Sequence, residues 1–213
     1  MARSETPPTT SRGEQTRQLI LDMAIRRFAD QGFRNTSVSA IARDLNLAPS
    51  AVYFHFADKE ALFAAAFDRD AARLCDEALG LPGPVDPDYW QRVVARFVTA
   101  MDTHPLAHRV LSGREPELLS RLIDGDVTQR IRTAMENSLR AGQSIGDIAA
   151  DLDPHDTAIA LEAIFTAVVL TVTQVGGTGS SERVHAVGHF VRSALMPSHG
   201  TVRPTPGTEQ NSP

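Results

Sequence analysis

Apolar residues recur along this chain at the three- and four-residue spacing of amphipathic helices, and no stretch shows the two-residue alternation of a strand. Near the N-terminus, Ile20, Ala24 and Phe28 stand four apart and predict a helix over residues 14–31. Gly32 follows this helix and can take the left-handed conformation that ends it, with Phe33 folding back on the last turn. The pattern therefore predicts a first helix with a sharp stop.

A short second helix is predicted next, because four apolar residues follow at positions i, i+3, i+4 and i+7: Val38, Ile41, Ala42 and Leu45. Either Thr36 or Ser37 can supply the oxygen that caps its start. Asn46 stands where the chain must turn, and asparagine tolerates the left-handed conformation better than most residues. Pro49 suits the first turn of a third helix, which we expect to end near Phe54.

A helix, a tight turn and a short helix within about twenty residues form the pattern of a helix-turn-helix. Here the pattern covers residues 37–56, although any small helical bundle with a tight turn would look the same. Asp58 is expected to cap a long fourth helix, which turns three apolar residues inward: Leu62, Ala66 and Phe67. We therefore predict an N-terminal domain over residues 13–79.

The stretch GLPGPVDPD, residues 80–88, breaks the helical pattern and predicts a domain boundary. Beyond it we expect a larger helical domain over residues 85–196, with helices at residues 87–103, 106–112, 115–141, 154–175 and 181–195. Residues 1–12 and 197–213 are rich in polar residues, lack apolar periodicity and are expected to be disordered tails. The fold class is therefore all-α: an N-terminal three-helix helix-turn-helix domain, a connecting fourth helix, and a larger C-terminal helical domain.

Composition and charge exclude few classes of protein. The chain has 213 residues, a net charge of −5 and a single cysteine, Cys75, which rules out an internal disulfide framework. With its polar N-terminus and no visible signal peptide, the protein is expected in the cytoplasm. The apolar run at residues 157–175 contains Glu162 and several threonines, so we interpret it as a buried helix rather than a membrane span.

Four ring side chains in a row, Tyr53-Phe54-His55-Phe56, precede Lys59, which is the only lysine in the sequence. Lys59 falls in the first turn of the predicted fourth helix, where unpaired N–H groups and a cation together favour an anion such as a DNA phosphate. Tyr53 and His55 can donate hydrogen bonds to the same phosphates. Phe56 and Phe54 are interpreted as apolar side chains that pack this corner onto the first and fourth helices.

The segment from Thr16 to Leu62 resembles the N-terminal domain of TetR-type transcriptional regulators. The similarity is carried by Ile20-Leu21, Ala24, Phe28-Ala29, Gly32-Phe33, Thr36-Ser37-Val38, Ile41-Ala42, Val52-Tyr53, His55-Phe56, Lys59-Glu60 and Leu62. The remaining two thirds match such proteins only in length and helical character. Asn46 replaces a frequent Gly, and Ala48 replaces a frequent Ser or Thr cap, so the third helix is expected to start less firmly by about 1 kcal/mol.

The resemblance implies a homodimer that lays its third helix in the DNA major groove at a near-palindromic operator. It also implies a regulator, most simply a repressor, that a small-molecule effector releases. Carried over by position, the DNA-binding residues are Ser37, Ser39, Arg43, Pro49, Ser50, Ala51, Tyr53, His55 and Lys59. Because Pro49, Ser50 and Ala51 offer one side-chain hydroxyl, we expect Arg43, DNA shape and water to share the reading of sequence.

In the C-terminal domain the resemblance assigns the last two helices to a dimer interface, with packing within one chain as the alternative. Their wide apolar faces comprise Ile159, Ala163, Thr166, Leu170, Ala186, Phe190 and Ala194. An effector cavity is expected among bulky residues that could also be plain core: Trp90, Phe97, Met101, Leu118, Leu122, Met135 and Phe165. Arg96, His104 or Arg109 could meet a polar group on such an effector.

No catalytic, cofactor or metal site is expected. His104 and His108 are four apart, but Pro105 stands where a zinc protease helix needs Glu. His185 and His189 lack a third ligand nearby, and Cys75 has no activating neighbour in sequence. Two other classes stay open: a small helical enzyme that uses the C-terminal cavity, and an adaptor that binds a protein through residues 154–195.

Overall fold

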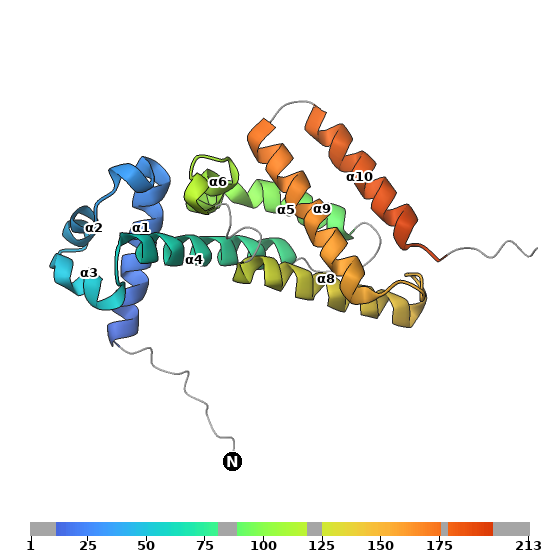
Figure 1. The fold of residues 1–213 in the computed structure, drawn as a ribbon, viewed down its shortest axis with the longest axis horizontal. Coiled ribbons are helices and arrows are strands. Elements are labelled where there is room, and N and C mark those ends of the chain that lie inside the picture. The colour runs from blue at the N-terminus through green and yellow to red at the C-terminus, as the bar shows by residue number, and fades with distance from the viewer. Residues whose placement is uncertain (1–11, 81–88, 119–124, 176–178, 198–213) are drawn as a thin grey trace, which may run out of the picture.

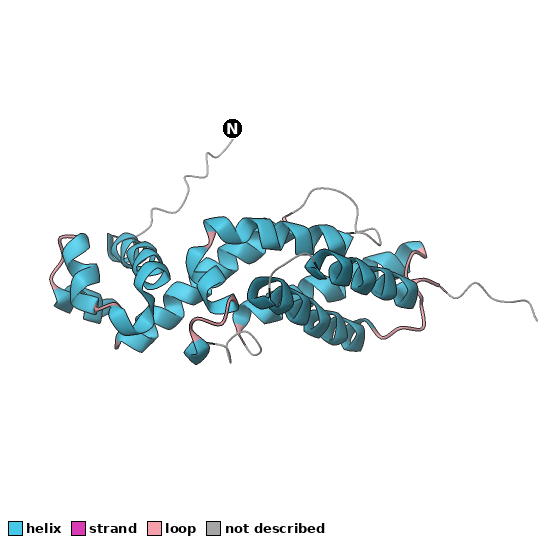
Figure 2. Cartoon of the chain, turned by 90° about the horizontal axis from the view of Figure 1, so that it is seen from above, coloured by secondary structure: helices cyan, strands magenta, loops and turns pink. Residues whose placement is uncertain are grey.

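The computed structural model describes residues 12–80, 89–118, 125–175 and 179–197, and the regular elements in these residues are all helices (Figures 1 and 2). The order along the chain is α1 (Arg12–Asn35), α2 (Val38–Asp44), α3 (Pro49–His55), α4 (Lys59–Leu79), α5 (Tyr89–Ala100), η1 (Met101–Thr103), α6 (Pro105–Leu111), η2 (Pro116–Leu118), α8 (Asp126–Ile145), α9 (Pro154–Val175) and α10 (Gly179–Leu195), where η marks a 3-10 helix. The all-α fold class is confirmed.

The N-terminal bundle consists of α1, α2, α3 and the first turns of α4, packed around fully buried side chains of α1. The Phe28 ring is 0% exposed and lies 4.8 Å from the ring of Phe63 on α4, centroid to centroid. Phe33 lies 4.9 Å from Phe63 on the same measure, so three rings join the end of α1 to α4. The short helices α2 and α3 pack against α1 and against each other.

The local signals read from the sequence in this bundle are confirmed. Gly32 breaks α1 with φ 78° and ψ 170°, and Asn46 takes the left-handed turn with φ 55°. Ser37, rather than Thr36, caps α2, since its Oγ accepts a hydrogen bond from the Ala40 N–H at 3.1 Å. Asp58 caps α4 through the Ala61 N–H at 2.7 Å, while Ala48 gives α3 no side-chain cap.

Helix α4 connects the two parts of the molecule. Figure 1 shows it running out of the N-terminal bundle and on between the C-terminal helices, where it packs against α5, α6 and α8. The end of α4 is fixed by the Tyr89 hydroxyl, which donates a hydrogen bond to the Leu79 carbonyl at 3.0 Å. A single rigid element therefore reaches from the short helices to the core of the C-terminal part.

The helix predicted over residues 115–141 is wrong at both ends. Its first residues form η2, and α8 begins only after Gly125, whose extended backbone (φ −82°, ψ 164°) is not helical. At the other end α8 runs through Gly142, where the missing side chain leaves room for Ile148, and stops at the left-handed Gly146 (φ 83°). The predicted end at residue 141 is therefore four residues short of the observed end at Ile145.

Parts of the predicted tails and boundary fall outside the described residues. Residues 1–11 and 198–213 belong to the predicted tails, and residues 81–88 to the predicted domain boundary. The helices predicted over residues 106–112, 154–175 and 181–195 agree with α6, α9 and α10 within two residues.

Candidate nucleic-acid interface

Helices α2 and α3 present a polar outer surface at the end of the molecule far from α9 and α10 (Figure 1). Ser37 and Ser39 are exposed at the start of α2, and Arg43 is exposed near its end. On α3, Pro49 and Ser50 are exposed and Ala51 is half-buried. The buried sides of the two helices carry Val38, Ile41, Ala42 and Val52, so their outer sides are free to meet a ligand as large as a duplex.

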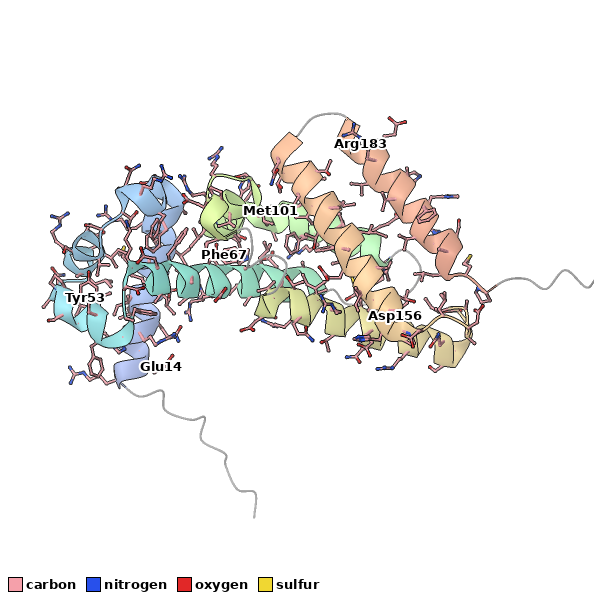
Figure 3. All side chains as sticks on the ribbon, viewed as in Figure 1. Glu14, Tyr53, Phe67, Met101, Asp156 and Arg183 are labelled. Atoms are coloured by element: carbon pink, nitrogen blue, oxygen red, sulfur yellow. The ribbon has the colours of Figure 1, made fainter. Side chains whose placement is uncertain are left out.

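Tyr53, His55 and Lys59, which we call the phosphate corner, lie around the turn from α3 into α4. Tyr53 is 51% exposed, and His55 and Lys59 are half-buried. Figure 3 places Tyr53 at the outer end of the molecule. The Lys59 ammonium lies 4.3 Å from the centroid of the Phe33 ring, a cation–π contact that orients the cation at the start of α4.

The two phenylalanines of this corner behave differently. Phe56 is 5% exposed and packs in the core, as expected. The expectation that Phe54 also packs inward is wrong, because its side chain is 84% exposed and its ring stands edge-on to His55 at 5.2 Å. Since α3 turns Val52 and Phe56 inward, Phe54 is carried to the outer side of this short helix.

Sequence reasoning missed one cation near the corner. The guanidinium of Arg17, on the second turn of α1, lies 5.1 Å from the centroid of the Phe56 ring. This contact brings Arg17 from a distant part of the sequence to the C-terminal end of α3, beside the phosphate corner. The only feature of the sequence that could have pointed to Arg17 is its position about one helical turn before Ile20, the first buried residue of α1.

Helices α9 and α10 carry an exposed apolar surface at the opposite end of the molecule. Five predicted interface residues form part of it: Ile159, Ala163, Ala186, Phe190 and Ala194, with Phe190 68% and Ile159 39% exposed. Thr166 lies elsewhere, because it lines a cavity and its hydroxyl donates to Glu162 at 3.2 Å. Leu170 is half-buried and packs on the core.

Helix α9 is expected to be a buried helix, but the structure buries only one side of it. The helix is long and apolar enough to cross a membrane, with mean hydropathy 1.6, yet only 28% of that window is buried. Its inner side packs against α8, α5 and α6. One such helix is weak evidence for a membrane, and the exposed apolar side calls for another partner.

A small, largely apolar cavity of about 50 Å³ lies between α4 and the helices around it, and we call it the α4 cavity. Its lining comes from α4 (Phe67, Asp68, Ala71 and Leu74), α5 (Phe97), α6 (Ala107 and Leu111), the start of α8 (Gly125, Val127, Thr128 and Ile131) and α9 (Phe165, Thr166 and Val169). The rings of Phe97 and Phe165 meet edge to face at 5.3 Å. Two of the predicted effector residues therefore line this cavity.

The other predicted effector residues lie elsewhere. Met135 lines a second apolar cavity, between α5, α8, α9 and α10, which shares Phe165 with the first. Met101 and Leu118 are buried, at 3% and 6% exposed, and line neither cavity. Leu122 and the side chain of Trp90 lie outside the described residues.

Three polar residues considered for effector binding are paired with carboxylates instead. His104 has its Nδ1 3.2 Å from Asp70 and its Nε2 3.3 Å from Glu77, both on α4. Arg96 on α5 also pairs with Glu77, at 2.9 Å. The second carboxylate oxygen of Asp70, which is 3% exposed, accepts the N–H groups of Leu106 and Ala107, each at 2.9 Å. These contacts fasten the start of α6 to α4.

Arg109, the third, joins α6 to α1. Its Nε donates to Glu115 at 2.6 Å, and its guanidinium also reaches the Ala29 carbonyl at 3.3 Å. Glu115 is 4% exposed and accepts the Phe33 N–H at 3.3 Å. A side chain at Gly32 would lie 2.5 Å from the Arg109 guanidinium, so the glycine permits this close approach. We call Arg109, Glu115 and Gly32 the α1–α6 tie.

The structure offers little chemistry for catalysis in the residues it describes. Burial raises the pKa of the Cys75 thiol to about 11, against a smaller opposing effect of Arg130, so the thiol stays protonated at neutral pH. No cluster of three metal-binding side chains is found among the described residues. The exposed end of α3 and the phosphate corner are therefore the best-developed candidate site.

Comparison with known proteins agrees with this geometry. Residues 20–66 match the family described as bacterial regulatory proteins, tetR family. The transcriptional regulator AcrR of Shigella flexneri is 43% identical over 56 residues, 26% of each chain. The A-factor receptor protein of Streptomyces griseus is 28% identical over 75% of this chain and 56% of its own length. The chain thus spans about a quarter and just over half of these two relatives.

A third relative and the solved structures extend the match over most of the chain. The transcriptional repressor AcnR of Corynebacterium diphtheriae is 29% identical, covering 84% of this chain and 92% of its own. A TetR-family regulator from Pectobacterium atrosepticum superposes with a TM-score of 0.66, 21% identity and coverage of 88% and 98%. FadR from Bacillus subtilis, solved with stearoyl-CoA, has a TM-score of 0.61, 16% identity and coverage of 84% and 99%. Residues 20–66 therefore form a DNA-binding domain of the TetR family of bacterial regulatory proteins, and the chain resembles TetR-family regulators over most of its length.

Proposed function

We propose that the protein is a homodimeric, sequence-specific DNA-binding repressor that a small-molecule effector releases from a near-palindromic operator. The observation that carries this proposal is the exposed outer side of α2 and α3 ending in the phosphate corner, where two ring donors at the end of α3 are followed by a cation at the start of α4. The name of the relative AcnR, a transcriptional repressor, favours repression over activation.

The DNA contacts divide into two groups. Tyr53, His55 and Lys59 would hold phosphates, together with Ser37 and Ser39 at the start of α2, where backbone N–H groups attract anions. Arg43, Pro49, Ser50 and Ala51 would face base edges in the major groove. The net charge of the chain is −5, which does not attract DNA, so DNA binding would depend on the local charge of this surface.

Dimerisation would cover the exposed apolar side of α9 and α10. Its apolar residues, including Phe190 and Ile159, suit a self-complementary interface about a two-fold axis. Such a dimer would present two α3 helices at a separation near one turn of DNA, about 34 Å, or a related spacing. The two-fold symmetry is the reason to expect a near-palindromic operator.

The substitution Phe190→Glu tests this interface. Because the axis introduces the charge twice into an apolar surface, we expect the dimer dissociation constant to rise by at least about a hundredfold. Analytical ultracentrifugation at micromolar protomer concentration would show the shift toward monomer. Ile145→Glu is the matched control, since Ile145 is 70% exposed at the end of α8. An unchanged dimer in Phe190→Glu, or equal dissociation in both variants, would exclude this interface.

The α4 cavity is the proposed effector site, since its lining includes both helices that connect to the N-terminal bundle. An effector there would press on α4 at Phe67 and Ala71 and on α6 at Ala107 and Leu111. Displacement of α4 carries the phosphate corner with it, and displacement of α6 acts on α1 through the α1–α6 tie. The free energy that couples effector binding to DNA release, typically about 1–3 kcal/mol, must come from a difference in the effector's affinity for the DNA-bound and released arrangements of the helices.

Selection of bound sites from random duplex DNA, followed by a salt titration on the selected site, tests the proposed function. We expect a near-palindromic site whose affinity falls roughly a thousandfold or more between about 50 and 200 mM salt, because several phosphate contacts are lost together. Absence of a preferred sequence, or binding that salt leaves unchanged, would favour the enzyme or adaptor alternatives. Compounds can then be screened for release of the protein from this site.

A further inference from the structure

Phe54 is the most exposed large apolar side chain among the described residues, at 84%. Burying a phenylalanine side chain stabilises a protein by roughly 1.5–3 kcal/mol, and Phe54 contributes almost none of this within the chain. Its neighbours Val52 and Phe56, at 1% and 5% exposed, already complete the buried side of α3. The fold therefore does not account for a phenylalanine at this position, and a ligand outside the chain can.

The position of Phe54 on α3 indicates which kind of ligand its ring would contact. Residues four apart lie on one face of a helix, so Phe54 shares a face with the exposed Ser50, which is predicted to meet base edges. This face offers one hydroxyl and an apolar ring to a duplex. In the major groove the apolar feature of the bases is the C5-methyl group of thymine, which aromatic side chains can contact directly.

The surroundings of Phe54 favour DNA over a protein or a lipid surface. Tyr53 is exposed beside it, and Lys59 stands five residues further on, at the start of α4. A protein interface that extended from Phe54 to the start of α4 would have to cover this lysine, and lysine is depleted from interface cores. A DNA duplex places phosphates and an apolar methyl group within reach of the same surface.

We propose that Phe54 reads thymine in the operator by packing its ring against a C5-methyl group in each half-site. This inference rests on the proposed function and adds a specificity-determining residue to it. It supplies the direct readout that Pro49, Ser50 and Ala51 provide only sparsely. The edge-on contact with His55, at 5.2 Å, limits how far the ring can turn and holds it at the end of α3.

The test removes single methyl groups from the DNA. Each thymine of the selected site is replaced in turn by deoxyuridine, which keeps base pairing and lacks only the C5-methyl group. We expect one position in each half-site where this replacement weakens wild-type binding about fourfold, the effect of one buried methyl-sized group. Phe54→Ala should bind the thymine site more weakly and lose the distinction between thymine and deoxyuridine at that position.

Tyr53→Phe is the matched control, because it changes the adjacent residue by one hydroxyl group and leaves Phe54 in place. It should weaken binding to both DNAs equally and keep the distinction. Thermal unfolding of Phe54→Ala should match wild type, since the ring is exposed. This check separates a lost contact from a lost fold.

The possible results distinguish a failure of the Phe54 inference from a failure of the proposed DNA-binding function. If wild type prefers a site but ignores every thymine methyl, or if Phe54→Ala keeps the full distinction, the inference is wrong and the proposed function stands. A uniform loss in Phe54→Ala that treats thymine and deoxyuridine alike would place the ring on the sugar–phosphate backbone and also overturn the inference. If wild type selects no duplex sequence, the proposed function itself fails.

Discussion

Replacing Lys59 with alanine is expected to weaken DNA binding on every sequence alike, by about ten- to a hundredfold for each protomer. Lys59 is the only lysine in the sequence, and its ammonium stands at the start of α4, held over the Phe33 ring at 4.3 Å. A hydrogen bond to a charged partner contributes about 1.5–3 kcal/mol, and the phosphate is charged. The salt dependence should also flatten by about one unit of log–log slope per protomer.

Fluorescence anisotropy on the selected site and on unrelated duplexes, across a salt series, measures both effects. Arg140→Ala is the matched control: it removes one cation from α8, where Arg140 pairs with Glu136 at 2.6 Å. Lys59→Arg should keep most of the binding, because the charge remains. A loss confined to the selected site, or an unchanged salt slope, would remove Lys59 from the phosphate contacts.

Replacing Asp70 with alanine is expected to destabilise the fold by about 3–5 kcal/mol. Its carboxylate is 3% exposed, accepts two backbone N–H groups at the start of α6 and faces His104. Without it, two buried donors and the His104 ring lose their shared partner. Because these contacts fasten α6 to α4, the loss should fall on the packing that surrounds the α4 cavity.

Urea unfolding at a fixed protomer concentration measures this change, since a dimer's stability depends on concentration. Asp70→Asn should lose less unfolding free energy than Asp70→Ala, because the amide oxygen can still accept a hydrogen bond. The exposed Asp102 of η1 provides the control, and Asp102→Ala should stay within about 0.5 kcal/mol of wild type. Equal stability of Asp70→Ala and Asp102→Ala would show that the carboxylate does not fasten α6.

Features that depend on neighbours in sequence were predicted well. The helix break at Gly32, the positive φ of Asn46, the caps Ser37 and Asp58, and the exposed position of Tyr53 all follow from residues within a few positions of one another. Capping oxygens and glycine or asparagine turns act within one helical turn, so their signals are local. The helix-turn-helix could be predicted from such signals alone.

Where several local signals competed, the sequence did not decide. Gly125, Gly142 and Gly146 all stand in or near the helix predicted over residues 115–141, and one lies inside α8. Gly142 lies inside α8 with Ile148 packed against it, a contact that only the folded chain makes. Phe54 and Phe56 look alike in sequence, yet the register of α3 against α1 buries one ring and exposes the other.

The sequence by itself determined the all-helical class, the helix-turn-helix and the start of α4 at Lys59, because periodicity, caps and turn residues encode each of them within a short segment. Only the tertiary structure decided the partners of Asp70, Arg109 and Glu115, the place of Arg17 beside Phe56, and the outward ring of Phe54. The Phe33 N–H and Glu115, for example, are 82 residues apart. Contacts of this kind form when separate helices pack together, and the pattern within any one helix carries no record of them.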